Sequence, residues 1–311
     1  MYYMTWKPMQ IRPGDIGAEA SAEGLLEYLR SAVDLDEQLV QAKALVFRGF
    51  NLPEQDLTGV LDLLLPNRLA YVHGNTPRTK VGENVYTSTE YPPEFTISMH
   101  NEMSYAYQWP SRLFFYCAVA PTTGGATPVV DGTAWLAVLD DDVRERFLPG
   151  VRYTQNLHDG IGFGKSWQAT FETDDRDEVE EFLATTEAEW QWLPQGGLRV
   201  TQHRRAVTEH PVTGDLVWFN QADQWHVAAL DPETAAAMRE ILTDEEMPQT
   251  VTFADGSPIP AADVIQVRDR GLATAVDVDW HAGDLMLIDN VAVGHGRRPF
   301  TGPRRVLVAM S

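Results

Sequence analysis

The chain has 311 residues, and its 24 lysines and arginines against 45 aspartates and glutamates give it a formal charge of −21. This charge excludes nucleic acid as an expected partner, because phosphate backbones are bound by clustered basic side chains. A composition of 44% hydrophobic and 22% charged residues is that of an ordinary globular protein. The uncharged apolar stretches are far shorter than the roughly 20 residues of a membrane-spanning helix, so no such helix is expected.

The only cysteine, Cys117, lies in an apolar run at residues 113–119. A thiol in such a run behaves as a small hydrophobic side chain, and we expect it to be buried and unreactive. One cysteine excludes an internal disulfide, and the first residues lack the basic and apolar regions of a secretory signal. The expected location is therefore the cytoplasm.

Several segments have helical spacing or a helix-start residue, and they predict helices over residues 24–33, 54–65, 133–147 with Thr133 as N-cap, 174 to about 190, and 231–242. Short apolar runs between Gly, Pro and Asp turns predict strands at residues 44–50, 112–119, 127–130, 198–203, 216–219, 250–253, 273–278, 285–288 and 305–310. Many short strands with irregular connections favour a sandwich or barrel over alternating parallel β-α-β units.

No internal repeat or long flexible linker divides the sequence, which favours one domain over residues 1–311. The acidic, largely helical segment at about 158–195 interrupts the strands and is interpreted as an insertion over one mouth of the barrel. Residues 74–95 are polar, contain three prolines and have little periodicity, so they are interpreted as a functional loop that acts as a lid.

Among the eight histidines, only His100 has a carboxylate two residues later, at Glu102. On a strand these two side chains point to the same face, where they can hold a metal ion. About one such pair is expected by chance in a chain of this composition, so the motif alone is weak.

Four polar residues nearer the C-terminus are candidates for substrate binding. Asn220, Gln221 and His226 follow the end of a predicted strand, and the alternative for them is a polar turn with a packed aromatic side chain. Arg298 either meets a substrate carboxylate or hydrogen bonds the loop backbone. His203 and His210 lack zinc-site spacing and are expected at the surface.

Three further sequence blocks accompany the His100 motif: Gly-Gly-Ala-Thr-Pro at 124–128, a Gly-Asp to Asp-Asn block at 283–290, and Gly-His-Gly-Arg-Arg at 294–298, followed by arginines 304 and 305. In this order they resemble the iron(II)- and 2-oxoglutarate-dependent taurine dioxygenase family, within the clavaminate synthase-like superfamily. The resemblance runs from about residue 44 to the end. It is closest to the amino-acid hydroxylases of peptide-antibiotic pathways, such as the syringomycin aspartyl hydroxylase.

The resemblance implies a mainly β fold with peripheral helices, a double-stranded β-helix or jelly roll. It implies that His100, Glu102 and His295 bind iron(II) as a facial triad, which leaves coordination sites for 2-oxoglutarate and dioxygen. Arg305 matches the family arginine that forks onto the far carboxylate of 2-oxoglutarate, and Thr127 adds a hydroxyl to the same cosubstrate. Asp289 and Asn290 are expected to orient the backbone before His295.

The implied reaction is hydroxylation of an aliphatic C–H of an amino acid or amino-acid-derived small molecule, free or bound to a carrier protein, in secondary metabolism. Desaturation, epoxidation and cyclisation remain alternatives, and the oligomeric state stays open. Ala309 stands where the taurine enzyme has its sulfonate-binding arginine, so taurine is not the expected substrate. Glu102 argues against halogenation, which needs a small residue at this ligand position.

Two competing interpretations belong to other classes of protein. A jelly-roll binding protein without turnover would have the fold but no iron affinity. A zinc hydrolase with the same three ligands would use a metal-bound water, but it gives no reason for Thr127 and Arg305. The basic cluster of residues 297, 298, 304 and 305 either contacts an acidic carrier or is used within the active site.

Overall fold

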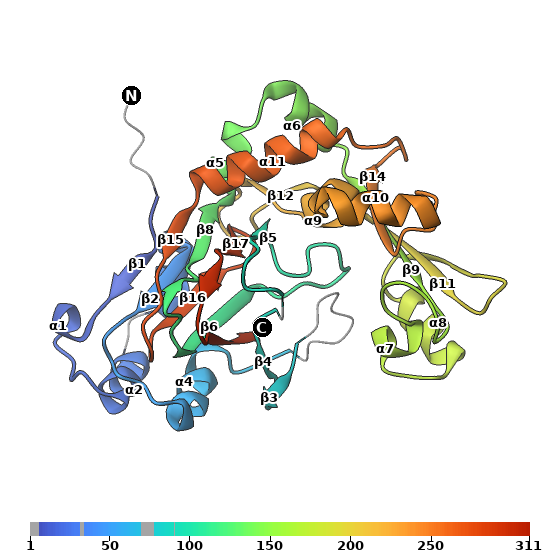
Figure 1. Cartoon of the computed structure of the whole chain (residues 1–311). Helices are drawn as coiled ribbons and strands as arrows, with labels where there is room; N and C mark the ends of the chain where they lie inside the picture. Colours follow the sequence, from blue (N-terminus) through green and yellow to red (C-terminus); the bar gives the residue numbers. More distant parts are fainter. Residues whose placement is uncertain (1–5, 32–33, 70–77, 90) are drawn as a thin grey trace.

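The computed structural model describes residues 6–31, 34–69, 78–89 and 91–311. Two β-sheets form its centre and helices surround them (Figure 1). The larger sheet has seven strands in the order β1 (Met9–Ile11), β2 (Ala44–Phe47), β16 (Leu285–Asp289), β6 (Arg112–Val119), β19 (Arg305–Met310), β4 (Val85–Thr87) and β3 (Lys80–Gly82). The smaller has four, in the order β15 (Val276–Val278), β8 (Thr127–Asp131), β17 (Val293–Arg297) and β5 (Ile97–His100). The predicted mainly β fold with peripheral helices is confirmed.

Side chains of the larger sheet alternate between two cores. In β16, Met286 and Ile288 pack into an inner core together with side chains of β8, β15 and β17, while Leu285 and Leu287 pack into an outer core with helices. A strand that is buried on both faces requires apolar residues at every position, which explains its continuous apolar sequence. Cys117 belongs to the inner core, as expected, and burial raises the pKa of its thiol to about 11.

Helices cover the outer faces of both central sheets (Figure 1). The outer core of the larger sheet includes side chains of α2 (Ala22–Ser31), α3 (Leu35–Ala42) and α4 (Leu57–Leu64), which follows the 3-10 helix η1 (Glu54–Asp56). On the other side, α5 (Gly132–Val138), α6 (Asp141–Phe147) and α11 (Ala261–Thr274) share a core with the smaller sheet. Further helices are α1 (Pro13–Ile16), α9 (Ala222–Trp225), η2 (Val227–Ala229) and α10 (Pro232–Ile241).

A third sheet lies to one side of the centre, in the order β10 (Glu189–Trp192), β11 (Leu198–Arg204), β9 (Val151–Leu157) and β14 (Gln249–Phe253). Two helices, α7 (Trp167–Phe171) and α8 (Arg176–Ala184), pack against it through a separate apolar cluster. The segment at 158–195 therefore contains two helices, as its sequence indicates, and ends in a strand (Figure 1, right). Two strand pairs complete the fold, β12 (Val207–Glu209) with β13 (Leu216–Trp218) and β7 (Thr123–Gly124) with β18 (Phe300–Thr301).

The segment at 74–95 is more regular than its sequence suggests. Strands β3 and β4 form a hairpin that adds to the edge of the larger sheet through β19. The described residues after it, 91–95, run beside the end of β17, and residues 74–77 and 90 lie outside the described residues. Within the part of the chain that the structure describes, no helix is long and apolar enough to cross a membrane.

Several predicted elements have different bounds in the structure, and three of them have a clear physical reason. The helix predicted over 133–147 is two helices, and its N-cap is Asp131, whose carboxylate accepts a hydrogen bond from Thr133 N at 3.0 Å. The helix predicted to reach residue 190 ends at Ala184, because the chain then enters β10. The strand predicted at 273–278 begins only at Val276, since its first residues end helix α11.

Gly271 in α11 gives a test of how closely the outer helix packs on the smaller sheet. A Cβ at this position would lie 2.6 Å from Cε2 of Trp135, whose ring also contacts Gly294 beside His295. We expect Gly271→Ala to lower the free energy of unfolding by about 1–3 kcal/mol, because the buried indole has to shift.

Gly59→Ala in α4 is the matched control for this substitution. Its Cβ would lie 3.6 Å from the nearest atom, so it should raise the free energy of unfolding by about 0.5–1 kcal/mol through helix propensity. Urea denaturation of both variants measures the two effects, and an unchanged Gly271→Ala protein would contradict the described packing.

Candidate metal centre

Two histidines face each other across the pair of strands β5 and β17. His295 in β17 lies opposite His100 in the antiparallel register, and their ring centroids are 4.3 Å apart. The His295 ring also packs edge-on against Phe115 of the larger sheet, with centroids 5.3 Å apart. Residues directly opposite in a sheet have neighbouring side chains, so the strand register itself brings these imidazoles together.

Gly296 allows the close approach of the two strands. A Cβ at this position would lie 2.5 Å from the carbonyl oxygen of Ile97 and 3.2 Å from Sδ of Met99, both in β5. The register shifts between His295 and Arg297, which is an irregularity of the kind found beside functional sites. The glycine between His295 and Arg297 is therefore required by packing.

Glu102 reaches the histidines by a different route from the one its spacing suggests. Strand β5 ends at His100, and residues 102–105 form a turn in which Met103 has a φ of 54°. Asn290 holds this turn: its Oδ1 accepts a hydrogen bond from Glu102 N at 2.8 Å, and its Nδ2 donates to Glu102 O at 3.0 Å and to Pro110 O at 2.8 Å. The turn, and not strand alternation, thus directs the carboxylate to the imidazoles.

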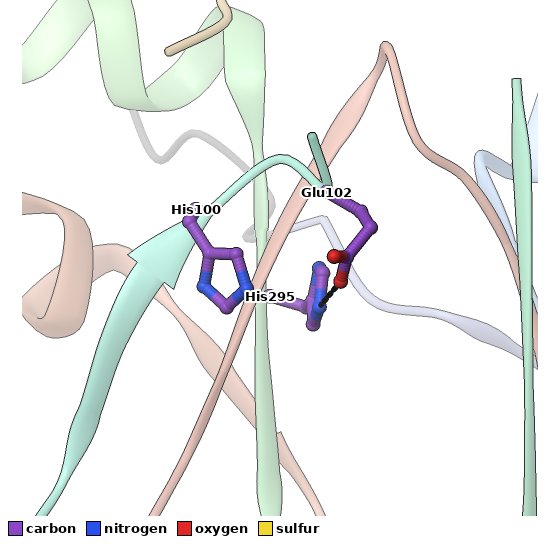
Figure 2. Close-up of side chains that lie close together, drawn as sticks. All are labelled: His100, Glu102 and His295. Carbon is purple, nitrogen blue, oxygen red and sulfur yellow. Dashed lines mark ion pairs between the residues drawn. The ribbon is translucent and has the colours of Figure 1, made fainter. Parts of the chain in front are cut away.

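The three side chains converge on one buried point (Figure 2). One ligand atom from each of His100, Glu102 and His295 lies within 4.8 Å of the others, and the three residues are 4–7% exposed. Nε2 of His295 is 3.9 Å from Oε2 of Glu102. Two nitrogen donors and one carboxylate form the donor set that mononuclear non-haem iron uses.

Burial keeps both imidazoles in the neutral form that binds metal ions. It lowers the pKa of His100, an effect that Glu102 partly opposes. It lowers the pKa of His295 well below the ordinary value, with further lowering by His100 and Arg78. Nδ1 of His100 lies 3.0 Å from Ser98 O, and a proton donated there leaves Nε2 as the ligand atom.

Two adjoining cavities meet at this group. The larger, of about 240 Å³, is lined by His100 and Glu102 together with side chains of β5 and α9 and with Thr89, Tyr91 and Thr96. The smaller is lined by His100 and His295 and reaches Thr127 and Arg304. Arg78 lines both cavities, and its Nη2 donates a hydrogen bond of 2.7 Å to Oε2 of Glu102.

Thr127 and Arg304 bring a hydroxyl and a cation into the smaller cavity. Oγ1 of Thr127 accepts a hydrogen bond from Nε1 of Trp280 at 2.9 Å, and a hydroxyl in this role still has its own hydrogen to donate. Nε of Arg304 donates to Gly125 O at 3.1 Å. Burial, followed by the charge of Arg297, lowers the pKa of Arg304 to about 10, so it remains a cation at neutral pH that an anion would stabilise.

Comparison with known protein families gives a match to the model of "Taurine catabolism dioxygenase TauD, TfdA family" over residues 10–310. The chain belongs to the TauD/TfdA dioxygenase family. The buried His-Glu-His group fits the metal of such an enzyme, since its donors are neutral imidazoles and a carboxylate. The protein is an iron(II)- and 2-oxoglutarate-dependent dioxygenase, which excludes the non-catalytic binding protein and the zinc hydrolase as its class.

Similar proteins support this TauD/TfdA assignment. The dapdiamide synthesis protein DdaC of Enterobacter agglomerans is 34% identical over 94% of this chain and 88% of its own length. A clavaminate synthase-like protein of Arabidopsis thaliana is 33% identical over 89% of this chain and 83% of its own. Among solved structures, PvcB of Pseudomonas aeruginosa has a TM-score of 0.53 at 15% identity, over 98% of this chain and 86% of that one, and therefore shows a similar fold.

The structure does not bring Arg305 to the cavities of this TauD/TfdA protein. Its Nη2 donates to Oε1 of Glu54 at 2.7 Å on the outer face of the larger sheet, and the Arg305 and Glu54 side chains are 39% and 43% exposed. Arg304 points to the opposite, inner face with Val306 and Val308. Of these two neighbouring arginines, Arg304 and not Arg305 therefore lines the smaller cavity.

The four candidate substrate residues lie in different places. Gln221 lines the larger cavity, where its amide donates to Asn101 O at 2.9 Å. Asn220 lies just before α9, where its Oδ1 accepts a hydrogen bond from Ala222 N. His226 lines another cavity, of about 560 Å³, beside the third sheet. Arg298 is not among the described lining residues of either metal-site cavity, and its Nε donates to Oδ1 of Asp277 at 2.9 Å.

Asp289 supports the turn before His295, as expected, through Oδ1, which accepts from Val291 N and Ala292 N. Its Oδ2 lies 2.9 Å from Nε2 of His210. The prediction that His210 lies at the surface is therefore wrong, because this pairing buries the ring, whereas His203 is exposed as predicted.

Sequence analysis also missed several residues of the larger cavity. Gln224 on α9 places its Nε2 3.0 Å from Nδ1 of His100, and the amide of Gln249 in β14 donates to Gln224 O at 3.2 Å. Arg78 and Tyr91 come from the segment predicted as a lid. None belongs to a motif with recognisable spacing, so only the folded chain identifies them.

Asn290 provides a test of how the carboxylate ligand is held. Asn290→Ala removes its side-chain hydrogen bonds to the backbone of Glu102 and Pro110. We expect the free energy of unfolding to fall by about 2 kcal/mol or more, and Mn(II) to bind about 10–100-fold more weakly. Urea denaturation and metal titration measure the two effects.

Asn67→Ala, at an exposed turn position, is the control and should change neither quantity. Wild-type Mn(II) affinity in the Asn290→Ala protein would show that this network does not position Glu102.

Proposed function

We propose that the protein hydroxylates an aliphatic C–H of an amino acid or amino-acid-derived small molecule in secondary metabolism. The observation that carries the proposal is the buried group His100, Glu102 and His295 beside a cavity of about 240 Å³, a volume that suits a small molecule. The 34% identity to a protein named for dapdiamide synthesis supports a biosynthetic role.

We propose that the two central sheets are the walls of a double-stranded β-helix and that the whole chain is a single oxygenase domain. The apolar core between the sheets supports the first statement, since strands of both contribute to it. The family match over residues 10–310 supports the second. The metal group then lies between the walls, with His295 on one and Phe115 on the other.

Each residue at the centre has a proposed task. Iron(II), 2-oxoglutarate and dioxygen supply the oxidising chemistry when bound. His100, Glu102 and His295 hold the metal, while Thr127 and Arg304 bind the far carboxylate of 2-oxoglutarate by a hydroxyl and a guanidinium. The smaller cavity supports this division, because it connects Thr127 and Arg304 with the two histidines.

Assigning the 2-oxoglutarate arginine to Arg304 in place of Arg305 does not change the argument against taurine as substrate. Four residues beyond Arg304 is Val308, which lines the smaller cavity, whereas Ala309 is buried in the outer core. An apolar side chain at this position cannot pair with a sulfonate.

The proposed substrate is free or carrier-bound. The contacts of the basic cluster at residues 297, 298, 304 and 305 do not favour binding of an acidic carrier protein. Arg298 pairs with Asp277, and Arg305 pairs with Glu54. Arg297 and Arg304 donate to backbone carbonyl groups at the cavity. Desaturation, epoxidation and cyclisation need only a different placement of the same substrate, so product analysis distinguishes them from hydroxylation.

Substrate-dependent succinate formation tests the function. Amino acids, free and thioester-linked, are screened with iron(II), 2-oxoglutarate and dioxygen, and a substrate should stimulate succinate release by the wild-type protein. His100→Ala should release less than about 1% as much, because a ligand is lost. A His100→Ala protein that forms succinate at the wild-type rate would refute the ligand assignment.

The neighbouring arginines give a paired test of the 2-oxoglutarate site. Arg304→Gln should raise the Kd of 2-oxoglutarate for the Mn(II) protein roughly 100-fold, because a buried charge pair is removed. Arg305→Gln removes only the exposed pair with Glu54 and should change the Kd less than about threefold. Calorimetric titration measures both Kd values. If Arg305→Gln weakened 2-oxoglutarate binding more than Arg304→Gln, Arg305 would be the residue that binds the cosubstrate.

A further inference from the structure

The cavity of about 560 Å³ beside the third sheet lies outside the metal centre, and none of its described lining residues is a metal ligand (Figure 1). We call it the third-sheet cavity. It shares one described lining residue, Trp225, with the larger cavity at the metal group. Its volume suits a small organic molecule, so the chemistry of its walls indicates what it binds.

Strand alternation places polar side chains on the face of the third sheet that lines this cavity. Thr154 of β9 pairs with Thr201 of β11 on one side and with Thr250 of β14 on the other, so these threonines form a row across the sheet. Arg152 of β9 and Arg199 of β11 each lie two residues from this row, and therefore on the same face. All five residues line the cavity. This wall consists of guanidinium and hydroxyl donors.

The guanidinium of Arg152 has no partner within the described part of the chain. No hydrogen bond or ion pair to a described residue involves it, although the residue is only partly exposed. Gly256 leaves room for it, since a Cβ at that position would lie 2.9 Å from Nη1 of Arg152. A partly buried cation without a counter-charge is unfavourable, so an anion in the cavity would stabilise it.

Arg199 is held in place and still has donors for a ligand. Its Nε donates to Asn156 Oδ1 at 2.9 Å, and its Nη2 donates to Glu245 O at 2.9 Å. A guanidinium has five N–H groups, and these two bonds leave three of them. A side chain that is already oriented loses little freedom when it binds an anion.

The charges of the described lining residues favour an anion as well. Three guanidinium groups stand against two carboxylates, of Asp244 and Glu245, and both acids are exposed. Asp244 pairs with the exposed Arg239 at 3.7 Å, whereas neither arginine of the sheet face forms an ion pair with a described carboxylate. His226 adds no charge, because its Nδ1 accepts a hydrogen bond from Ala228 N at 3.1 Å and the ring is therefore neutral.

The remaining walls indicate that the anion has an organic part. Several lining side chains are apolar and buried: Trp225, Met247 and Ile259. The donors of the sheet face come from separate strands and combine guanidinium with hydroxyl groups. Such donors suit a phosphate group, whose oxygens point in several directions, better than a planar carboxylate.

We propose that the third-sheet cavity is a second ligand site, which binds a small organic phosphate. Arg152 and Arg199 contact the phosphate, and the apolar side chains contact the organic part. Two sources supply such a group, a free phosphorylated metabolite and the phosphopantetheine arm of a carrier protein. The second source would connect this site with a carrier-bound substrate, because Trp225 lines both cavities.

The test compares two organic phosphates, pantetheine 4′-phosphate and phenyl phosphate, with pantetheine and phenol, which lack the phosphate. Calorimetry measures their binding to the full-length protein with Mn(II) and 2-oxoglutarate present to occupy the metal centre. We expect at least one ester to bind about tenfold or more tightly than its unphosphorylated counterpart, the effect of one charge-assisted contact. Tighter binding of pantetheine 4′-phosphate indicates the carrier arm, and tighter binding of phenyl phosphate indicates a compact free metabolite.

Three variants locate the phosphate within the molecule. Arg152→Gln breaks no described contact and should reduce the preference for the ester to within about threefold. Thr250→Val keeps the shape of the row and should weaken binding of the tighter ester about three- to tenfold. Arg270→Gln removes an exposed arginine that pairs with Asp140 outside the described lining, and it should change the Kd less than about twofold.

Thermal denaturation provides a second readout and shows whether each variant is folded. The tighter ester should raise the Tm of the wild-type protein and of Arg270→Gln, but not that of Arg152→Gln. Thr250→Val keeps the test decisive if Arg152→Gln does not fold.

The contrary outcomes are specific. Equal binding of each ester and its unphosphorylated counterpart by the wild-type protein would refute the site, and so would a preference that persists in a folded Arg152→Gln protein. An equal loss in Arg270→Gln would show that only the net charge of the protein matters, which also refutes it. Because no described lining residue is a metal ligand, this inference and the proposed function fail independently.

Discussion

The metal centre depends on the pairing of β5 with β17. This pairing sets His100 opposite His295, and it requires the absence of a side chain at Gly296, where a Cβ would collide with the β5 backbone. Everything else at the centre is arranged around these two strands. The turn after β5 supplies the carboxylate, and Asn290 after β16 holds that turn by its backbone.

The strand pair also explains why the site is buried and electrostatically sensitive. The His295 ring packs against Phe115 of the inner core, and burial opposes any charge on either imidazole. A carboxylate in the same place needs a partner, and Arg78 supplies one. The buried carboxylate of the centre is thus paired with a buried cation.

Sequence analysis predicts the convergence of the ligands from motif order, but it cannot choose between adjacent arginines. In β19 the residues on both faces are apolar, because Val306 and Val308 face the inner core while Leu307 and Ala309 face the outer helices. The pattern therefore does not reveal which of Arg304 and Arg305 points inward. Only the ion pair with Glu54, 251 residues away in the chain, settles the orientation.

Other features could not be predicted because they depend on distant contacts. The burial of His210 follows from its pairing with Asp289, and the strand register that places Asp289 there involves residues far along the chain. The helix α11 has few apolar residues at helical spacing and is fixed by its fit against Trp135. The sequence therefore predicts only the last residues of this helix, and it predicts them as part of a strand.

Arg297 links residues beside the larger cavity to β17, the strand that carries the ligand His295. It lies two residues after His295, and its guanidinium donates to the carbonyl oxygens of Tyr91, Pro92 and Phe95. Residues 91–95 are consequently anchored to the strand that carries His295. A change that loosens this segment would therefore disturb this ligand as well. Redesign of the cavity for bulkier molecules is better directed at Ala229 and Leu230, which end a short helical turn that carries no metal ligand.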